Sequence, residues 1–240
     1  MSRLPLNRSI ELGARYRYPA PAMPEQKFFD ADVNWFWLTQ GPESDSPLMK
    51  LDRGISAPRS VEKKSGSGAT FKTIPYIVTT SAPHRHGDTD SPWFDGSNTT
   101  GSGVVWPYWG ETKPGEESKL ISSVGNQRLL QALALLSEQS AMAPYLVPPV
   151  IVTFSEGKTG PGKGYRRVAG VARVTFAELK RCWAANEDKW YWNIAFRLEY
   201  VEFGFDQKLI PMEWLNARRN KDVTLEQAFS LAPDPWRSLF

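Results

Sequence analysis

The chain contains 240 residues, of which 41% are hydrophobic and 23% are charged. This composition supports a buried core and argues against wholesale disorder, and the length suits one large domain or two small ones. No stretch reaches the ~18–20 apolar residues of a membrane span, and no apolar run follows the N-terminal Met-Ser-Arg, so we expect neither a transmembrane segment nor a signal peptide. Cys182, His84 and His86 are the only cysteine and histidines, too few for an intrachain disulfide or a Cys/His zinc site. We therefore expect a cytoplasmic protein without a metal or other cofactor.

Charged residues are unevenly distributed along the chain. Lysine and arginine number 29 against 26 acids, a net charge of +3. Residues 157–181, however, hold seven bases and one acid, and residues 182–206 hold five acids and two bases. This contrast favours either a positive face that binds a polyanion or a solvated loop beside an acidic strand, and charge alone does not decide between the two.

The first 80 residues contain few strong signals for secondary structure. Four prolines block helices and central strands within residues 1–30, which we interpret as a peripheral basic arm. Residues 31–38 have the composition of a strand, and a mobile loop rich in Ser, Pro, Gly and Lys is expected at about 41–70. The β-branched run 72–80 predicts a strand, which Pro75 places at an edge or beside a bulge.

The rest of the chain alternates strands and helices. Leucines at helical spacing predict an amphipathic helix within residues 118–138, and Thr224 is a candidate N-cap for a late helix. The expected strands are 150–154, 165–176 and 189–205, and the expected helices are 176–184, 211–219 and 224–231. This order indicates an α+β fold with a mixed or curled sheet.

Motifs for catalysis are weak. The glycine-rich loop 156–164 lacks the Gly-Lys-Ser/Thr ending of a nucleotide-binding P-loop, because Lys163 is followed by Gly164. Cys182 is most simply a small packed residue. The acid-x-Lys pairs that metal-dependent nucleases use are too common here to be specific, and they occur at Glu62/Lys64, Glu111/Lys113, Glu178/Lys180, Glu187/Lys189 and Asp206/Lys208. A nuclease site within the chain is therefore uncertain, and we expect none.

One stretch carries a more specific signal. Trp93 and Asp95 precede a Gly/Asn/Thr loop, and the strand after it contains Trp106, Tyr108 and Trp109. A site for a nucleobase flipped out of a duplex needs flat rings for stacking and an acceptor for an exocyclic amine, and Asp accepts a hydrogen bond from the N4 amine of cytosine. The alternative is a tight turn, with the tryptophans packed in the core and Asp95 capping the loop.

An ordered set of motifs over residues 70–240 resembles the modified-cytosine recognition domain of modification-dependent restriction endonucleases of the AspBHI/MspJI type, which is SRA-like. The motifs are Pro92-Trp93-x-Asp95, Gly103-Val-Val-x-x-Tyr108-Trp109-Gly110-Glu111, Gly125-Asn126-x-x-Leu129-Leu130, Pro148-Pro149-Val150-Ile151-Val152-x-Phe154, Gly170-Val-Ala-x-Val174, Trp192-Asn193-x-x-Phe196, Pro211-x-x-Trp214-x-x-x-Arg218-Arg219 and Ala232-Pro233-x-x-Trp236.

The resemblance implies an SRA/PUA-like half-barrel, a curled mixed β-sheet flanked by helices, that forms a single DNA-binding domain over residues 31–240. It implies double-stranded DNA containing 5-methylcytosine as partner, with the modified base flipped into a site of Asp95, Trp93, Trp106, Tyr108 and Trp109. Trp106 and Tyr108 alternate in phase, so both are expected to face this site. The implied DNA contacts are His84, Arg85, His86, Lys113, Asn126, Arg128, Lys158, Lys163, Arg166 and Arg167.

The resemblance favours a stand-alone reader or the reader part of a restriction system, associated with the nucleoid and served by a separate nuclease partner. Two alternatives remain open at this point: a methylation-dependent endonuclease and a PUA-like RNA-binding module. Oligomeric state, sequence context and the choice between 5-methyl and 5-hydroxymethyl groups do not follow from the sequence.

Overall fold

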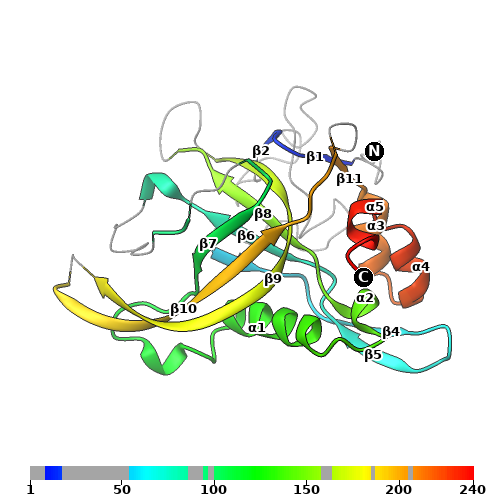
Figure 1. Cartoon of the computed structure of the whole chain (residues 1–240), viewed down its shortest axis with the longest axis horizontal. Coiled ribbons are helices and arrows are strands. Elements are labelled where there is room, and N and C mark those ends of the chain that lie inside the picture. The colour runs from blue at the N-terminus through cyan, green and yellow to red at the C-terminus, as the bar shows by residue number, and fades with distance from the viewer. Residues whose placement is uncertain are drawn as a thin grey trace, which may run out of the picture.

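The structure is a computed structural model, and it describes residues 9–17, 54–85, 94–96, 100–157, 164–184, 187–204 and 208–240. The strand expected at 31–38 and the first part of the expected loop, 41–53, lie outside these residues. Figure 1 shows a curved sheet with one helix along it and a group of short helices at one end.

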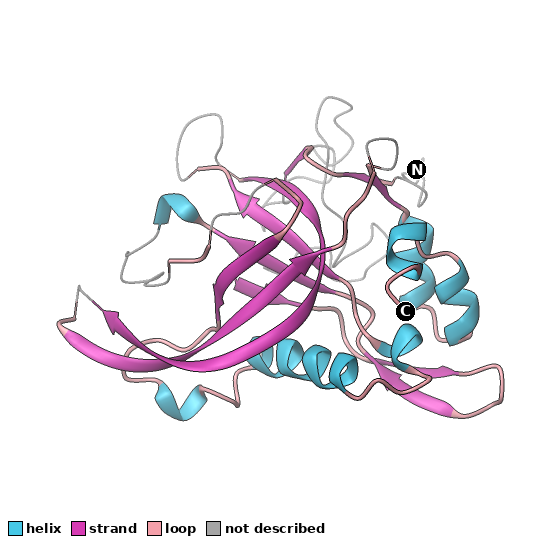
Figure 2. Ribbon diagram, viewed as in Figure 1, coloured by secondary structure: helices cyan, strands magenta, loops and turns pink. Residues whose placement is uncertain are grey.

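A mixed sheet of seven strands forms the centre of the fold (Figure 2). Six strands follow the order β3-β6-β8-β9-β10-β7, and β2 pairs with β9 beside this path. β6 and β8 are parallel, and the remaining pairs are antiparallel. The bounds are β2 Arg15–Arg17, β3 Gly54–Ser56, β6 Ile77–Ser81, β7 Val104–Trp109, β8 Val150–Ser155, β9 Tyr165–Ala184 and β10 Lys189–Tyr200. The expected α+β class with a mixed sheet is thereby confirmed.

Two small sheets and several helices complete the fold. β1 (Ile10–Glu11) pairs with β11 (Leu209–Ile210), and β4 (Val61–Lys64) pairs with β5 (Thr70–Thr73). The helices are η2 Pro83–Arg85, η3 Glu117–Lys119, α1 Val124–Ser137, α2 Ala143–Leu146, α3 Met212–Arg219, α4 Leu225–Ser230 and α5 Asp234–Arg237. Among the described residues, no helix is both long and apolar enough to cross a bilayer.

The core is divided into two clusters. One lies between the sheet and α1 and contains Leu129 together with Phe196 and Leu198 of β10. The other lies under the C-terminal helices, where the buried rings of Trp214 and Trp236 are 5.6 Å apart. Burial of these aromatic and aliphatic side chains from water fixes the helices on the sheet.

Several expected elements are found close to their expected bounds. Strand 150–154 corresponds to β8, and the two late helices correspond to α3 and α4. Thr224 caps α4 as expected: its Oγ1 accepts from Gln227 N, and the Gln227 side chain accepts from Thr224 N in return. This reciprocal pair satisfies two donors that a helix start leaves open.

Four expectations differ from the structure in detail. Residues 176–184 are not a helix but the far end of β9, because each of them has a partner on β10 and local helix propensity yields to this pairing. The expected loop 41–70 contains β3 and β4 in its described part. The run 72–80 is split into β5 and β6 around Pro75, which cannot donate to a strand ladder. Part of the expected arm, residues 9–17, pairs with β9 and β11.

The two end strands of the six-strand path are joined by side chains. The Tyr108 hydroxyl on β7 donates to Gly54 O on β3 at 3.3 Å. Just beyond β7, Glu111 Oε1 accepts from Ile55 N of β3 at 3.4 Å. Strands that are farthest apart in the sheet order are thus within reach of one side chain.

Two buried cations tie the C-terminal helices to the body of the protein. Lys63 is 2% exposed, and its ammonium donates to Ala217 O and Asn220 O at the end of α3, at 2.8 and 2.6 Å. Arg218 is also buried and donates to carbonyl oxygens of Pro75 and Val147. Burial, with a smaller contribution from the nearby Arg218 charge, lowers the pKa of Lys63 to about 8.

This lowered pKa predicts that stability increases at alkaline pH. Between about pH 8 and 10.5 the folded chain binds fewer protons at Lys63 than the unfolded chain, so the free energy of unfolding should rise with pH in this window by up to ~3 kcal/mol. Urea unfolding at several pH values measures this slope. Lys63→Met should abolish it, whereas Lys64→Met, at an exposed position on the same strand, should retain it. An equal slope in all three proteins would contradict the assignment.

Candidate nucleic-acid interface

Asp95 is held between two strands that lie far apart in the sheet order. The Ser81 hydroxyl at the end of β6 donates to Asp95 Oδ2 at 2.8 Å, and the Trp109 backbone N–H at the end of β7 donates to Asp95 Oδ1 at 2.9 Å. A carboxylate oxygen has two acceptor sites, and among the described residues Ser81 and Trp109 are the donors to Asp95, so in this part of the chain each oxygen retains one site for another donor. The carboxyl group is therefore held in place and can still accept further hydrogen bonds.

Burial sets the protonation of this group. Removal from water raises the pKa of Asp95 to about 6, and the hydrogen bonds from Trp109 and Ser81 oppose this rise without cancelling it. Asp95 can therefore gain or lose a proton close to neutral pH. The same surroundings, including the charge of Asp95, raise the pKa of the buried Tyr108 hydroxyl well above its ordinary value.

The backbone around Asp95 is packed directly on β7. Gly96 N donates to Pro107 O at 2.7 Å, and the Trp109 indole N–H donates to Phe94 O at 3.3 Å. A Cβ at position 96 would lie 2.3 Å from Trp106 O, so only glycine fits this close approach. Phe94 is 62% exposed and is an aromatic residue beside Asp95 that the sequence analysis did not select.

The aromatic residues of β7 do not all face the same way. Tyr108 is 2% exposed and belongs to the core, whereas Trp106 and Trp109 are partly exposed. A β-bulge opposite β10 falls between Val105 and Tyr108, so these two residues, three apart, both point inward. The expectation that Trp106 and Tyr108 share a face was therefore wrong. Trp93 lies outside the described residues.

Trp106 points toward the outer half of β9. Its ring lies 5.9 Å from the ring of Phe176, and Lys180 Nζ lies 4.9 Å from the centre of the Trp106 ring. Both distances are within the range of favourable ring and cation–π contacts. Trp106 is thus supported from one side by an aromatic ring and a cation.

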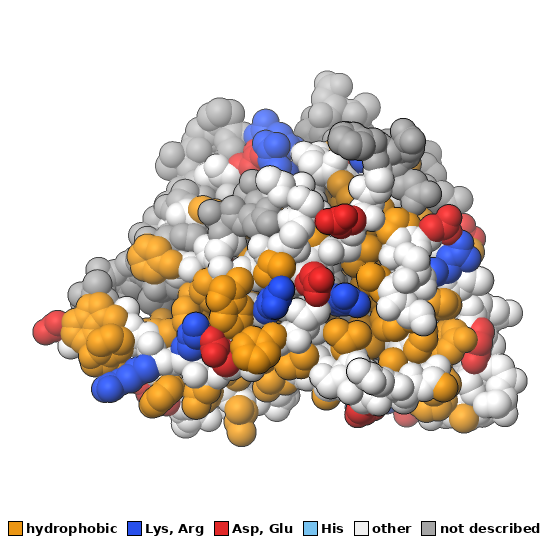
Figure 3. All heavy atoms as spheres, viewed as in Figure 1, with side chains coloured by type: hydrophobic (Ala, Val, Ile, Leu, Met, Phe, Trp, Pro, Cys, Tyr) orange, Lys and Arg blue, Asp and Glu red, His pale blue; other side chains and the backbone are white. Residues whose placement is uncertain are grey.

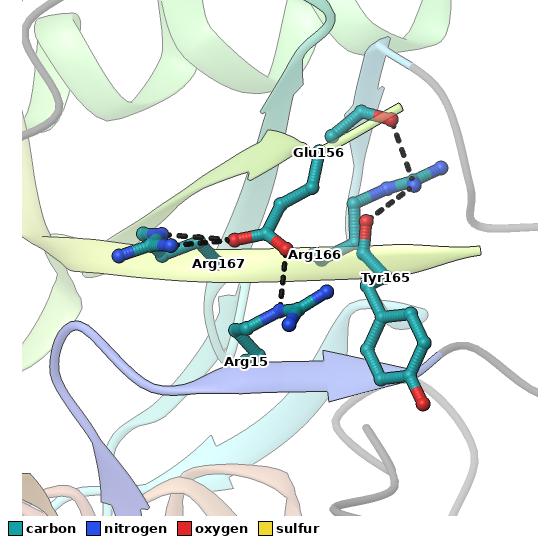
Figure 4. Close-up of polar contacts among 6 residues, drawn as sticks. Arg15, Glu156, Tyr165, Arg166 and Arg167 are labelled. Carbon is teal, nitrogen blue, oxygen red and sulfur yellow. Dashed lines mark hydrogen bonds and ion pairs between the residues drawn. The ribbon is translucent and has the colours of Figure 1, made fainter. Parts of the chain in front are cut away.

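A cluster of arginines lies where β2 joins β8 and β9 (Figure 4). Glu156 Oε1 accepts from Arg167 at 2.8 Å, and Glu156 Oε2 pairs with Arg15 Nε at 2.5 Å. The guanidinium groups of Arg15 and Arg17 lie 4.8 and 5.5 Å from the centre of the Tyr165 ring. Counting Arg166, the cluster holds four cations and one acid, and Arg15 and Arg167 are exposed.

Comparison with solved structures identifies the fold. The chain is similar to a chain of the MspJI restriction endonuclease in complex with a 27-mer oligonucleotide, with a TM-score of 0.77 and 24% sequence identity over 97% of this chain and 51% of that chain. It is also similar to the DNA recognition domain of the cytosine modification-dependent restriction endonuclease LpnPI, with a TM-score of 0.53 and 17% identity over 91% of this chain and 84% of that chain. The chain has the fold of these recognition domains.

The chain spans about half the length of the MspJI chain that it matches. A scan against protein-family models finds no match, and a search of curated proteins finds none either. The similarity to solved structures is thus one of fold, and it agrees with the resemblance that the sequence motifs carry.

The residues expected to contact DNA differ in their exposure and in their hydrogen-bond partners. Arg167 is exposed and Arg166 is 8% exposed, with Arg166 Nη1 donating to Ser155 Oγ and Tyr165 O. Arg85 and Lys113 are partly exposed. Arg128 Nη1 donates to Ser60 Oγ at 2.8 Å, across the gap between α1 and the segment before β4. His84 lies in η2, and His86, Lys158 and Lys163 lie outside the described residues.

Asn126 has a structural role, which corrects the expectation that it contacts DNA. Its side chain is fully buried at the start of α1; Oδ1 accepts from Glu111 N at 2.9 Å, and Nδ2 donates to Leu120 O at 2.7 Å. Glu111 Oε2 accepts from Gly125 N at 3.0 Å, at the positive end of the same helix. The Gly125-Asn126 motif therefore anchors α1 to the end of β7.

Acidic residues form ion pairs rather than metal clusters in the described part of the chain. No group of three or more His, Cys, Asp or Glu side chains there could hold a metal ion. Of the acid-x-Lys pairs, Glu178 pairs with Lys180 at 2.6 Å, and Glu187 pairs with Lys189 at 2.7 Å.

The role of Asn126 predicts a loss of stability without a specific loss of binding. Asn126→Ala leaves the buried Glu111 N–H and Leu120 carbonyl without these partners, which should reduce the free energy of unfolding by about 1–3 kcal/mol. Chemical denaturation measures the loss. Gln127→Ala, at the exposed next position on α1, should change stability by less than about 0.5 kcal/mol. If Asn126→Ala were as stable as the wild type and bound DNA more weakly, Asn126 would be a contact residue after all.

Proposed function

We propose that the chain binds double-stranded DNA containing 5-methylcytosine and holds the modified base, flipped out of the helix, against Asp95. The observation that carries this proposal is the fixed Asp95 carboxyl group, with one acceptor site on each oxygen that no described residue occupies, in a fold shared with DNA recognition domains. In this role the protein acts as a reader and not as a nuclease.

Asp95 matches the Watson–Crick edge of cytosine when it carries a proton. That edge offers the N4 amine as a donor and N3 as an acceptor, so a carboxyl group with one proton can accept from N4 and donate to N3. A pKa of about 6 makes the proton inexpensive to hold near neutrality. Thymine presents the opposite pattern, a donor at N3 and an acceptor at position 4, and is matched only when the proton lies on the other carboxyl oxygen.

We infer that the sheet is the curled half-barrel that the resemblance implies. In a flat sheet, the five steps from β3 to β7 would separate these strands by roughly 24 Å. The Tyr108 and Glu111 hydrogen bonds to β3 support strong curvature instead. Curvature of this kind would bring together the ends of β6 and β7, which Asp95 joins through its hydrogen bonds to Ser81 and Trp109.

The free energies of unstacking, restacking and methyl burial predict that such a site prefers 5-methylcytosine over cytosine only modestly. Unstacking a base costs a few kcal/mol, and stacking on an aromatic side chain returns about 1–3 kcal/mol. Phe94, Trp106 and Trp109 are exposed or partly exposed and are the candidates for stacking, together with Trp93. One methyl group contributes only ~1 kcal/mol of transfer energy, which is about fivefold in affinity. A preference for 5-methylcytosine over cytosine of about 10–200-fold, as an apolar slot gives for one methyl group, therefore also needs a close match of shape.

The arginine cluster supplies an electrostatic attraction that does not depend on sequence. Arg15, Arg17 and Arg167 place three cations near the start of β9, and Glu156 offsets one of these charges. Contacts of this kind to phosphates strengthen binding to any duplex and weaken with added salt. We propose that this cluster, with Lys158 and Lys163, binds the DNA backbone.

Substitution of Asp95 tests the base site. Asp95→Ala should remove the preference for a methylated duplex, a change of about 1–3 kcal/mol in relative affinity, and leave salt-sensitive binding to both duplexes. Fluorescence anisotropy titrations of matched methylated and unmethylated duplexes measure both quantities.

Two control variants distinguish a loss of methyl preference from a general loss of DNA binding. Glu138→Ala removes an exposed carboxylate at the end of α1 and should leave the preference unchanged. Arg167→Ala should weaken both duplexes alike. Equal affinity of the wild type for the two duplexes would overturn the proposal, and stronger binding to structured RNA competitors would point to an RNA-binding module.

The shared proton predicts a pH dependence of binding. If the complex keeps a proton that free Asp95 loses above about pH 6, affinity for the methylated duplex should fall as pH rises from 6 to 8, by up to about tenfold per unit, and level off below 6. Asp95→Asn carries a permanent donor and acceptor in the same arrangement, so it should retain methyl preference with a flat pH profile. A flat profile in the wild type would show that Asp95 binds the base as a carboxylate.

A further inference from the structure

The far halves of β9 and β10 leave the sheet as a two-stranded ribbon. We call residues 176–184 and 189–194 the aromatic ribbon. β9 pairs with β8 only as far as Ala172, and β10 pairs with β7 only from Ala195 onward. Within the part of the chain that is described, the ribbon therefore has no third strand on either side, and Figures 1 and 2 show it extending away from the rest of the sheet.

Large aromatic side chains are exposed on one face of the ribbon. Trp183 lies opposite Trp190, with ring centres 5.1 Å apart, and Arg181 lies opposite Trp192. The three tryptophans are 44%, 52% and 45% exposed. Figure 3 shows hydrophobic side chains gathered over this end of the molecule, with cations beside them.

This face is the outward continuation of the core. Residues two apart on a strand share a face, so Ile194 and Phe196, which are buried in the core, lie on the same face as Trp190 and Trp192. The hydrophobic strip thus extends beyond the point where α1 and the core cover it. Exposed strips of this kind mark interaction sites.

The aromatic ribbon together with residues 185–188, which join its two strands in the sequence, carries no excess charge. Residues 176–194 include three acids and three bases, and Lys180 and Lys189 each form an ion pair with a glutamate two positions earlier. Binding to a phosphate backbone relies on excess positive charge, which this segment lacks. Exposed tryptophan and arginine, by contrast, contribute most to protein–protein interfaces.

Along the outer edge of β10, the backbone N–H and C=O groups of alternate residues point away from β9. Ile194 O accepts from Gly110 N, and Ile194 N donates to Asn193 Oδ1, so the backbone groups of Ile194 point away from β9. This direction alternates along an antiparallel strand, so the N–H and C=O groups of Trp190 and Trp192 also point outward. No bond from another described segment reaches them.

We propose that a second copy of this chain pairs with this edge, with β10 antiparallel to β10 of the copy about a two-fold axis at Tyr191. Trp190 then lies opposite Trp192 of the copy and exchanges both backbone hydrogen bonds with it, as the outward phase of both residues requires. The sequence Trp190-Tyr191-Trp192 is symmetric about Tyr191, which a self-pairing strand needs.

The pairing completes the aromatic face. Each row across the four strands contains Trp183, Trp190, Trp192 of the copy and Arg181 of the copy, so three indoles and one guanidinium lie side by side. Aromatic cross-strand pairs and cation–π contacts both stabilise paired strands. The interface uses none of the residues of the proposed base site, so either proposal can fail without the other.

Sedimentation equilibrium of the whole chain over a range of concentrations tests the dimer. Trp192→Lys places an ammonium group opposite Trp190 of the copy and should raise the dimer dissociation constant at least tenfold. Adding Trp190→Glu supplies a carboxylate opposite that ammonium group and should recover most of the loss. Leu209→Lys, at another exposed apolar position on β11, should leave the dimer unchanged.

A cross-linking experiment tests the register. Paired residues of this type have Cα atoms about 5.5 Å apart, within the span of a disulfide. In a Cys182→Ala background, Trp190→Cys mixed with Trp192→Cys should form a disulfide-linked heterodimer under mild oxidation, and neither variant alone should cross-link as fast. A wild-type chain that stays monomeric at about 100 μM, a concentration well above the Kd of most specific complexes, would overturn the proposal. So would a Trp192→Lys variant that loses DNA binding while the wild type is monomeric, since the ribbon would then contact DNA.

Discussion

The hydrogen bonds to Asp95 are the constraint on which the candidate site depends. Ser81 lies on β6 and Trp109 on β7, two strands that are four steps apart in the sheet order. Both residues donate to the same carboxyl group. A buried carboxyl without such donors would be costly, so the bonds hold the loop 94–96 and the ends of two strands together. The same group remains partly desolvated, which raises its pKa toward neutrality. Position and protonation of Asp95 therefore have one structural origin.

The sequence predicted the local elements well where a local rule decides them. Thr224 with Gln227 signals a capped helix start, and the β-branched run of β8 signals a buried strand. It failed where partners distant in sequence decide. Residues 176–184 have a helical composition, but β10 pairs with them across the hairpin. The bulge in β7, which separates Trp106 from Tyr108, depends on the register with β10 and has no signature in β7 alone.

The candidate site shows the same division. Asp95 was selected for its chemistry, whereas Ser81, which fixes it, is a buried serine at the end of a strand and looks like many others. Asn126 was selected because it stands in a motif, and the motif proves to anchor α1. Arg15 and Arg17 belong to the segment that the sequence predicts as a basic arm, and their place beside Arg167 and Glu156 follows only from the pairing of β2 with β9.

Because β9 and β10 are long, they connect the candidate base site with the aromatic ribbon. Near Phe176 the paired strands support Trp106 through ring and cation contacts, close to the loop that carries Asp95. Farther out, the same strands carry Trp183, Trp190 and Trp192 on the face that the core leaves uncovered. A two-stranded ribbon without further support is only marginally stable in water. Pairing with a copy would make the ribbon part of a four-stranded sheet, and the stiffer ribbon would in turn hold Lys180 against Trp106. Association of two chains would then order the aromatic side of the base site without any contact to the base itself.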